Sequence, residues 1–271
     1  MTINLKTRTA VVTGAAGGIG RALVLEAARR GMNVSIADVD EQGLGQTVEL
    51  VRPSGAQVLQ TRVDVSRRDE VAALARRTFE TFTSVAVVFA NAGVLRTGST
   101  VRPDLDAWDL MIDVNMRGTS NTISAFISRM VKQDEPSRFV ITGSQASLLA
   151  SRDLGAYTAT KHALWAVAET LKTELEAEGA NVGVSLLCPG AVRTGIADRR
   201  DGTDGTEVEA AMRRRLVEVG MAPEKVAQIA FDAVLAGRFW IFTHTEFKAS
   251  LERRFGRVLS ESDPEPWDRR S

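Results

Sequence analysis

The chain has 271 residues, of which 44% are hydrophobic and 25% are charged, proportions that are typical of a globular protein. This composition excludes a disordered chain, a collagen-like fibre and a small disulfide-rich scaffold. The 34 basic and 34 acidic side chains cancel, whereas a nucleic-acid-binding protein usually carries a basic excess. We therefore expect no nucleic-acid partner.

Cysteine content and hydropathy indicate the compartment. Cys188 is the single cysteine, so no disulfide can form within the chain, which favours a reducing compartment. No apolar run approaches the roughly 20 residues that cross a bilayer, and residues 1–10 lack the apolar core of a signal peptide. We expect a cytoplasmic protein with no membrane partner. Two histidines and one cysteine also offer no metal-ligand cluster, so no metal is expected.

Short apolar runs alternate with longer stretches of helical periodicity. The runs predict strands at Thr9–Thr13, Asn33–Asp38, Gln57–Thr61, Val85–Ala90, Arg138–Thr142, Val182–Leu187 and Phe239–Thr243. Runs without polar alternation are typical of parallel strands buried on both faces. The alternation predicts right-handed βαβ units and an α/β fold, a Rossmann-type doubly wound parallel sheet of seven strands with helices on both faces.

Two helices have clear starting signals. Ser66 and Asp69 form a capping box, and the face behind them carries Val71, Leu74, Ala75 and Phe79. A second helix begins after Asp104 and runs toward Met130. No linker divides the chain, so we expect residues 1–271 to form a single domain. Within it we expect a flexible insertion at 195–221, which ends in an amphipathic helix, and a loosely ordered tail at 246–271.

A glycine-rich turn follows the first predicted strand. Residues 13–20 read Thr-Gly-Ala-Ala-Gly-Gly-Ile-Gly, and a helical pattern begins after them. Glycine permits a positive φ and close approach of a ligand to the backbone, and the first N–H groups of a helix attract phosphate. The turn therefore predicts a dinucleotide site that includes Gly14, Gly18, Ile19 and Gly20. No Lys-Ser/Thr pair follows the glycines, which argues against a triphosphate P-loop.

Asp38 ends the second predicted strand, near the separation from the glycines at which an acid binds the adenosine ribose. Its carboxylate would accept hydrogen bonds from the ribose hydroxyls and repel a 2′-phosphate. Val39 follows it, and neither Ala15 nor Ala16 offers a positive charge. The predicted cofactor is therefore NAD. The alternative is that Asp38 caps the following helix.

Tyr157 is the only tyrosine, and Lys161 lies four residues later in a helical pattern, so both project from one face. A free phenol has a pKa of about 10, and a nearby ammonium favours the phenolate. The pair can act as a general base on an alcohol or as a general acid in reverse. Tyrosine and lysine at this spacing also occur by chance, so the pair alone does not identify an active site.

The motifs together resemble the short-chain dehydrogenase/reductase family, in its single-domain subclass of about 250 residues. The resemblance spans about residues 7–243 and contains, in order, Thr13-Gly14-x-x-x-Gly18-x-Gly20, Asp64-Val65, Ala90-Asn91-Ala92-Gly93, Asn115, Ser144, Tyr157-x-x-x-Lys161 and Pro189-Gly190-x-Val192-x-Thr194. Gly17 also fits the pattern of the longer epimerase-type subclass. That subclass has an additional substrate domain, for which this chain has no room.

The resemblance implies the catalytic roles. Tyr157 exchanges the proton with the substrate oxygen, and Ser144 orients that oxygen. Lys161 binds the nicotinamide ribose and lowers the pKa of Tyr157, while Asn115 holds a water for a proton relay. Ser147 is a nearby alternative serine, but the family spacing favours Ser144.

The resemblance also implies further cofactor contacts and an assembly. The contacts are Asp64 and Val65 at the adenine, Asn91 beside the cofactor, and Val192 and Thr194 at the nicotinamide carboxamide. In the family, the helix that carries Tyr157 pairs with its copy, so a homodimer or homotetramer is expected. The apolar stripe of that helix comprises Leu164, Val167, Ala168, Leu171 and Leu175.

The predicted function is hydride transfer between NAD and a small-molecule substrate, a secondary alcohol or its ketone. One alternative is an NADPH-dependent ketone reductase, which Asp38 disfavours. Enoyl reductases of related fold separate their tyrosine and lysine by more residues. A nucleotide-sensing regulator without catalysis would be expected to lack Ser144, Tyr157 or Lys161, and all three are present.

The substrate is less defined than the reaction. The family places its substrate-binding segment at 195–221, and we expect this segment to close over bound ligands. Its apolar residues are Ile196, Val208, Met212, Leu216 and Met221, and the opposite wall is predicted at Leu148, Leu149 and Leu154. This lining favours a bulky hydrophobic alcohol. Arg213–Arg215 are interpreted as a solvated helix face, Cys188 as a buried thiol and His244 as a structural hydrogen-bonding group.

Overall fold

The computed structural model describes residues 3–198 and 207–265. Its strands are β1 (Thr9–Thr13), β2 (Asn33–Asp38), β3 (Val58–Arg62), β4 (Val85–Ala90), β5 (Ser137–Thr142), β6 (Val182–Cys188) and β7 (Trp240–Phe242). They form one seven-stranded parallel sheet in the order β3-β2-β1-β4-β5-β6-β7. The predicted Rossmann-type sheet is confirmed, and its strands start and end within about two residues of the apolar runs.

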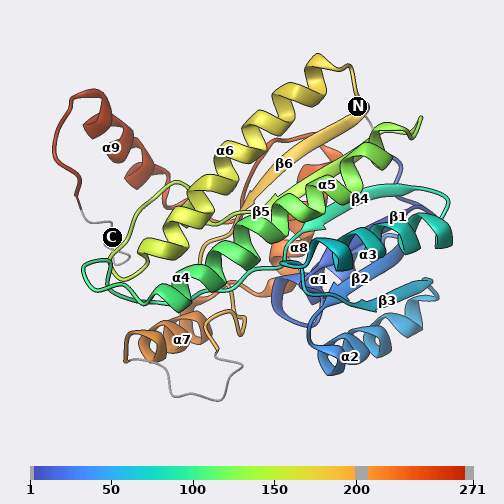
Figure 1. Ribbon diagram of the computed structural model, residues 1–271, viewed down its shortest axis with the longest axis horizontal. Coiled ribbons are helices and arrows are strands. Elements are labelled where there is room, and N and C mark those ends of the chain that lie inside the picture. Colours follow the sequence, from blue (N-terminus) through green and yellow to red (C-terminus); the bar gives the residue numbers. More distant parts are fainter. Residues whose placement is uncertain (1–2, 199–206, 266–271) are drawn as a thin grey trace.

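Helices cover both faces of the sheet (Figure 1). Their bounds are α1 (Gly18–Arg29), α2 (Glu41–Val51), α3 (Arg68–Thr81), α4 (Leu105–Met111), α5 (Gly118–Val131), α6 (Gly155–Ala177), α7 (Glu207–Val219), α8 (Pro223–Leu235) and α9 (Lys248–Leu259). One apolar core joins α1, α2 and α8 to the sheet, and a second joins α3, α5 and α6 to the opposite face. Every residue of β4 is buried, which explains its run of apolar residues without polar alternation.

The order of the strands places the site. From β1 the chain proceeds outward to β2 and β3, and then returns to β4 on the other side of β1. In such sheets ligands bind where the order reverses, at the carboxyl ends of the strands. The turn after β1 and the loop after β4 both lie at this point.

The start of α3 differs from the predicted capping box. The helix begins at Arg68, with Arg67 at the N-cap position and no side-chain cap. Ser66 instead donates its hydroxyl hydrogen to Asp64 Oδ1, so this serine stabilises the preceding turn. The apolar face is as predicted, since Val71, Leu74 and Ala75 are buried.

The helix predicted after Asp104 has an internal irregularity. Asp104 caps α4 by accepting a hydrogen bond from Ala107 N. A π-helical turn, Ile112–Arg117, then connects α4 to α5. Such turns are often found at functional sites, and this one contains Asn115.

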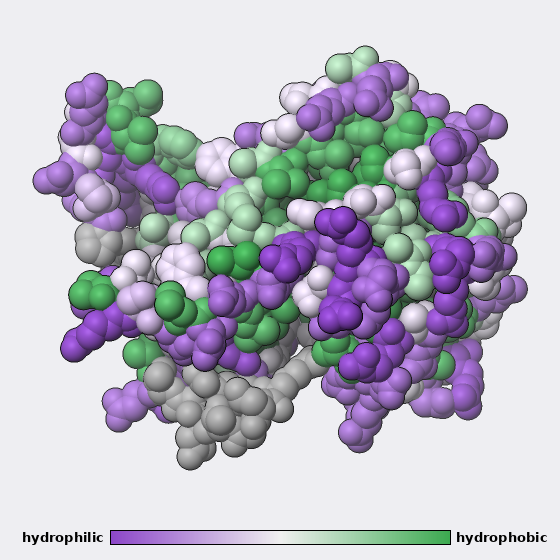
Figure 2. Space-filling view, in the orientation of Figure 1, coloured by the Kyte–Doolittle hydropathy of each residue, from purple (hydrophilic) through white to green (hydrophobic). Residues whose placement is uncertain are grey.

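The apolar stripe of α6 packs within the subunit. Its residues Leu164, Ala168, Leu171 and Leu175 are buried in the core shared with α3 and α5. The opposite side of α6 remains on the surface. Figure 2 shows apolar side chains gathered over α5 and α6. Ile123 and Ile127 of α5 and Val167 of α6 are half-buried.

Two segments lie outside the sheet and its flanking helices. Part of the predicted insertion, residues 199–206, lies outside the described residues, and the rest includes the expected helix, α7. The segment after β7 contains a helix that was not predicted, α9, which stands apart from the sheet (Figure 1). Within residues 3–198 and 207–265, none of the helices is long and apolar enough to span a membrane.

Candidate active site

The turn after β1 depends on three glycines. Gly14 and Gly18 have φ angles of +70° and +51°, a region that favours glycine. A Cβ on Gly14 would lie 2.8 Å from Ala92 Cα, a Cβ on Gly18 would lie 2.9 Å from Thr194 Cγ2, and a Cβ on Gly20 would collide with the Gly14 carbonyl. Gly17, in contrast, is extended and faces open space, so the geometry supports the single-domain pattern.

The start of α1 is a prepared anion site. The first N–H groups of a helix have no intrahelical partner, and no side chain caps this helix. Unpaired N–H groups at a helix start attract phosphate through their hydrogens and the helix dipole. The helix start with its three glycines therefore suits a pyrophosphate.

Asp38 is held beside this turn. Its Oδ2 accepts a hydrogen bond from Ala16 N at 3.0 Å, and its Oδ1 accepts one from Asp40 N at 3.1 Å. The helix cap of α2 is Asp40, whose Oδ1 accepts from Gly43 N at 2.9 Å. The alternative role of Asp38 as the cap of α2 is therefore wrong.

Arg21, the cation nearest in sequence to the turn, already has hydrogen-bond partners within the protein. Arg21 donates to the carbonyl oxygens of Ala16 and Gly43, and its Nε donates to Thr47 Oγ1 at 3.0 Å. Its guanidinium therefore joins the turn to α2. It lines a different cavity from the one that contains Asp38.

Asn91 connects the ends of three strands. Its N–H donates to Thr13 Oγ1 and its Nδ2 donates to the Thr13 carbonyl, both at 3.0 Å. Its Oδ1 accepts from Thr142 Oγ1 at 3.3 Å. The residue fixes β4 against β1 and β5 at the edge where the cavity opens.

Lys161 is a buried cation beside Tyr157. Its Nζ donates to the Thr142 carbonyl at 2.8 Å and lies 5.7 Å from the centre of the Tyr157 ring. Burial lowers the pKa of Lys161 from 10.5 to about 8, because an ammonium is poorly stabilised away from water. Both side chains come from one face of α6, as their spacing predicts.

The two candidate serines have different environments. Ser147 is fully buried, and its Oγ accepts a hydrogen bond from Ser144 N at 3.1 Å. Ser144 lines the cavity and accepts from Ala146 N at 3.1 Å. Ser147 therefore supports the backbone, while Ser144 is available to a ligand.

Asn115 lies behind the cavity wall. It is fully buried, with Nδ2 donating to the Val94 carbonyl at 3.1 Å and to Thr160 Oγ1 at 3.1 Å, and with Oδ1 accepting from Val94 N at 2.8 Å. These partners occupy its amide and connect the π-helical turn to the loop after β4 and to α6. Its neighbour Val114, not Asn115 itself, lines the cavity.

A cavity of about 710 Å³ brings the other predicted residues together. They are Gly14, Gly18, Ile19, Gly20, Asp38, Asp64, Val65, Asn91, Ser144, Tyr157, Lys161, Val192 and Thr194. Asp38 and Asp64 lie on the β2 and β3 side of the sheet switch, and Ser144 and Tyr157 lie on the β5 side. The cavity is therefore long enough to place two different groups at its two ends.

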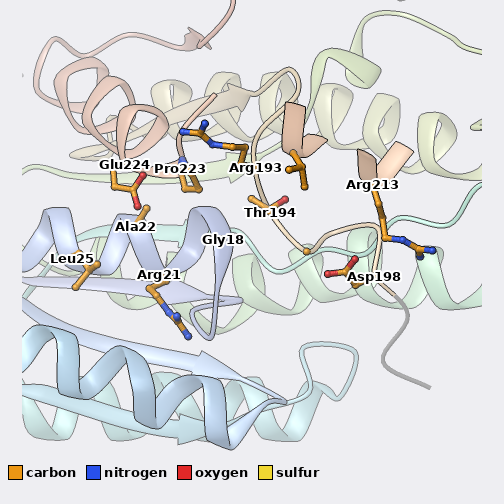
Figure 3. A pocket seen from close by; sticks show the side chains of 12 residues that line it. Gly18, Arg21, Ala22, Leu25, Arg193, Thr194, Asp198, Arg213, Pro223 and Glu224 are labelled. Atoms are coloured by element: carbon orange, nitrogen blue, oxygen red, sulfur yellow. The ribbon is translucent and has the colours of Figure 1, made fainter. Parts of the chain in front are cut away.

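The segment after β6 separates this cavity from a second one. Gly18, Thr194, Gly195 and Asp198 line both. Figure 3 shows the second cavity, of about 500 Å³, with Arg193 on the side of Pro223 and Glu224, and with Arg213 on the other side, beyond Asp198. Thr194 packs against Gly18 of the glycine turn where the two cavities meet.

The roles predicted from the sequence are wrong for several side chains near the cavity. Leu148 and Leu149 pack against Phe247 in a separate apolar cluster, so only Leu154 of the three predicted leucines lines the cavity. Arg215 also lines the cavity, so Arg213–Arg215 are not simply a solvated face. Arg215 follows Met212 by three positions, and helical periodicity could have shown that they share a face.

The remaining polar candidates have structural partners. Burial raises the pKa of the Cys188 thiol to about 12, which makes it unreactive at neutral pH. His244 Nδ1 accepts from Gly190 N at 3.2 Å and lies 2.7 Å from Thr243 Oγ1, while the residue also lines the cavity. Burial lowers the pKa of His244. No group of three or more His, Cys, Asp or Glu suited to a metal occurs in the described part of the chain.

Comparison with known proteins identifies the family. A family model described as short chain dehydrogenase matches residues 8–204. The chain belongs to the short-chain dehydrogenase family. Family membership makes it an oxidoreductase of a kind that acts on hydroxyl groups.

Individual relatives match along nearly the whole chain. A 1-deoxy-11-beta-hydroxypentalenate dehydrogenase of Streptomyces exfoliatus is 33% identical over 94% of this chain and 90% of the relative. A short-chain dehydrogenase/reductase of Burkholderia phymatum, solved in complex with NAD, has a TM-score of 0.93 and 34% identity, covering 97% of this chain and 99% of the other. An alcohol dehydrogenase of Thermococcus sibiricus, solved with 5-hydroxy-NADP, has a TM-score of 0.73 and 26% identity, with coverages of 85% and 91%.

The residues of the cavity fit a nicotinamide dinucleotide. The three glycines leave space that a Cβ would fill, the start of α1 offers unpaired N–H groups, and Asp38 presents a carboxylate beside them. The short-chain dehydrogenase fold, with a relative solved in complex with NAD, supports the same class of cofactor.

Proposed function

We propose that this short-chain dehydrogenase is NAD-dependent and interconverts a bulky, hydrophobic secondary alcohol and its ketone. The observation that supports the proposal is that Ser144, Tyr157, Lys161 and Asp38 line one cavity. A bound NAD supplies the hydride acceptor for the alcohol carbon. The chain's own residues bind the alcohol oxygen and move its proton.

Ser144, Tyr157 and Lys161 have distinct catalytic tasks in this proposal, and Asn115 is a positioning residue. Ser144 donates a hydrogen bond to the substrate oxygen and fixes it beside Tyr157. Tyr157 removes the hydroxyl proton as the hydride leaves the carbon, and returns it during ketone reduction. Lys161, held by the Thr142 carbonyl, favours the phenolate through its charge. Asn115 positions the loop after β4 and α6 through Val94 and Thr160.

Apolar residues support the substrate class. Tyr157 belongs to a cluster with Leu95, Leu154 and Leu216, three leucines that also line the cavity. A hydrophobic skeleton placed there would bury apolar surface at about 25 cal/mol per Å². A relative named for a hydroxypentalenate dehydrogenase is consistent with a bulky hydroxylated substrate.

The experiment that tests this function is a screen of secondary alcohols. Aromatic, alicyclic, steroid-like and terpenoid alcohols are incubated with the protein and NAD, and NADH formation is followed. The corresponding ketones are tested with NADH and with NADPH. Oxidation of at least one alcohol class supports the proposal, whereas activity confined to NADPH and ketones would favour the alternative of an NADPH-dependent ketone reductase.

Asp38 tests the choice of cofactor. We expect Asp38→Asn to raise the ratio of kcat/KM for NADP to that for NAD by about tenfold, since a charge facing the 2′-phosphate is worth about 1–4 kcal/mol. Asp40→Asn is the matched control, because asparagine caps a helix as well as aspartate and Asp40 lies outside the cavity lining. A wild-type protein that already prefers NADP would contradict this interpretation of Asp38.

We further propose that the protein forms a homodimer or homotetramer through the surface of α5 and α6. Short-chain dehydrogenases commonly form oligomers, and apolar side chains gather on this surface (Figure 2). Multi-angle light scattering measures the mass directly. A monomer at assay concentration would contradict the proposal, and Ile127→Glu should shift an oligomer toward monomer.

A further inference from the structure

Arg96 lines the cavity next to Leu95, a residue of the apolar cluster that contains Tyr157. It follows β4 in the loop that begins with Asn91, is half-buried, and lines the cavity. Its Nη1 donates to the neighbouring Leu95 carbonyl at 3.0 Å. No carboxylate among the described residues lies within ion-pair distance of it. A guanidinium has five N–H donors, and a partly buried charge is stabilised when it is paired.

The apolar cluster beside Arg96 connects it to the reacting group. Leu95, Leu216 and Tyr157 belong to this cluster. Arg215 precedes Leu216 on α7 and also lines the cavity. Arg96 and Arg215 thus both line the cavity that contains the proposed general base. Besides Lys161 and His244, they are the basic side chains that line this cavity in the described part of the chain.

The carboxylates of the cavity are placed elsewhere. Asp38 and Asp64 lie at the ends of β2 and β3, at the proposed adenosine end. Asp198 lies against Gly195 and lines both cavities. Burial lowers the pKa of His244, and the negative charge of Glu246 raises that pKa by a smaller amount. None of the four forms an ion pair with Arg96 within the described residues.

We propose that the substrate carries a carboxylate, which Arg96 binds across the apolar cluster from the reacting hydroxyl. This inference rests on the proposed function, because it places the hydroxyl at Ser144 and Tyr157. The substrate class is then a hydrophobic hydroxy acid whose apolar skeleton separates its two polar groups. Arginine suits this role because its planar guanidinium binds both oxygens of a carboxylate.

A matched substrate series tests the proposal. Saturated fatty acids with a hydroxyl on the penultimate carbon vary only in the distance between hydroxyl and carboxylate, and each is compared with its methyl ester. At the best chain length we expect kcat/KM for the acid to exceed that for the ester by about tenfold to a hundredfold, the value of a hydrogen bond to a charged group. Arg96→Gln should reduce this ratio to about one, chiefly through KM.

The control variant is Arg102→Gln. Arg102 is exposed and lies outside the cavity lining, so it should leave the acid-to-ester ratio unchanged. Binding of the corresponding keto acids, measured by calorimetry in the presence of NADH, provides a readout that does not need turnover. Wild type should bind the keto acid more tightly than its ester, and Arg96→Gln should lose that preference.

The outcomes separate the two proposals. Oxidation of alcohols with no preference for the acid at any chain length would overturn the carboxylate site and leave the proposed function intact. Keto-acid binding that depends on Arg96, without oxidation of any alcohol, would overturn the function and support the site. Neither binding nor oxidation would overturn both.

Discussion

Tyr157→Phe should reduce kcat for alcohol oxidation by about 10²–10⁴, the range for loss of a general acid–base group. The substitution removes the phenolic hydroxyl and keeps the ring that packs with Leu95, Leu154 and Leu216. NAD affinity should therefore stay within a few-fold of wild type. Steady-state kinetics and calorimetric titration with NAD measure the two quantities on the same preparation.

Thr158→Val is the control for this substitution. Thr158 is the next residue of α6, is buried, and has no hydrogen-bond partner for its hydroxyl within the described residues. Its loss should leave kcat within a few-fold of wild type. Near-normal turnover in Tyr157→Phe would remove Tyr157 from the proposed mechanism.

Lys161→Met should abolish most activity while stabilising the cofactor-free protein at neutral pH. The folded protein holds Lys161 with a pKa of about 8, below its ordinary value of 10.5, so the unfolded chain binds this proton more readily. The free energy of unfolding of the wild type should therefore rise as pH increases from about 8 to 10.5. Below pH 8 it should be up to about 3 kcal/mol lower than above pH 10.5. Methionine removes this cost and loses the hydrogen bond to Thr142, for a net gain of about 1–2 kcal/mol.

Urea denaturation at pH 7 and pH 10, without cofactor, measures the stability effect. The advantage of the variant should shrink at the higher pH, because wild-type Lys161 is then largely neutral. Lys172→Met is the control, since Lys172 lies on the exposed part of the same helix and pairs with Glu176. A variant that is less stable than wild type at both pH values would show that the hydrogen bond outweighs the buried charge.

The sheet could be predicted from the sequence because its strands are buried on both faces. The residues of β4 show this directly, since each is apolar and each is buried. The glycine turn was also predictable, because Gly14 and Gly18 adopt φ angles that other residues rarely adopt. In both cases a local physical requirement restricts which residues can occur.

Features set by packing between distant segments were not predictable. The π-helical turn around Asn115 depends on hydrogen bonds to Val94 and Thr160, and nothing in the local pattern of residues 112–117 indicates it. Leu148 and Leu149 were assigned to the substrate wall, but Phe247, about a hundred residues later in the chain, covers them. Ser66 had the residue type of a helix cap, yet Asp64 accepts its hydrogen bond instead.

The uncapped start of α1 has a consequence for the lifetime of the protein. A helix start without a side-chain cap leaves its first N–H groups to water in the free chain, and an anionic ligand can pair them instead. A ligand that binds only the folded state adds about 2.7 kcal/mol at a concentration one hundred times its Kd. Degradation in cells often follows the population of unfolded chain. The abundance of this enzyme should therefore follow the cellular concentration of the nucleotide. A fall in that concentration should lower both the activity of each enzyme molecule and the number of enzyme molecules.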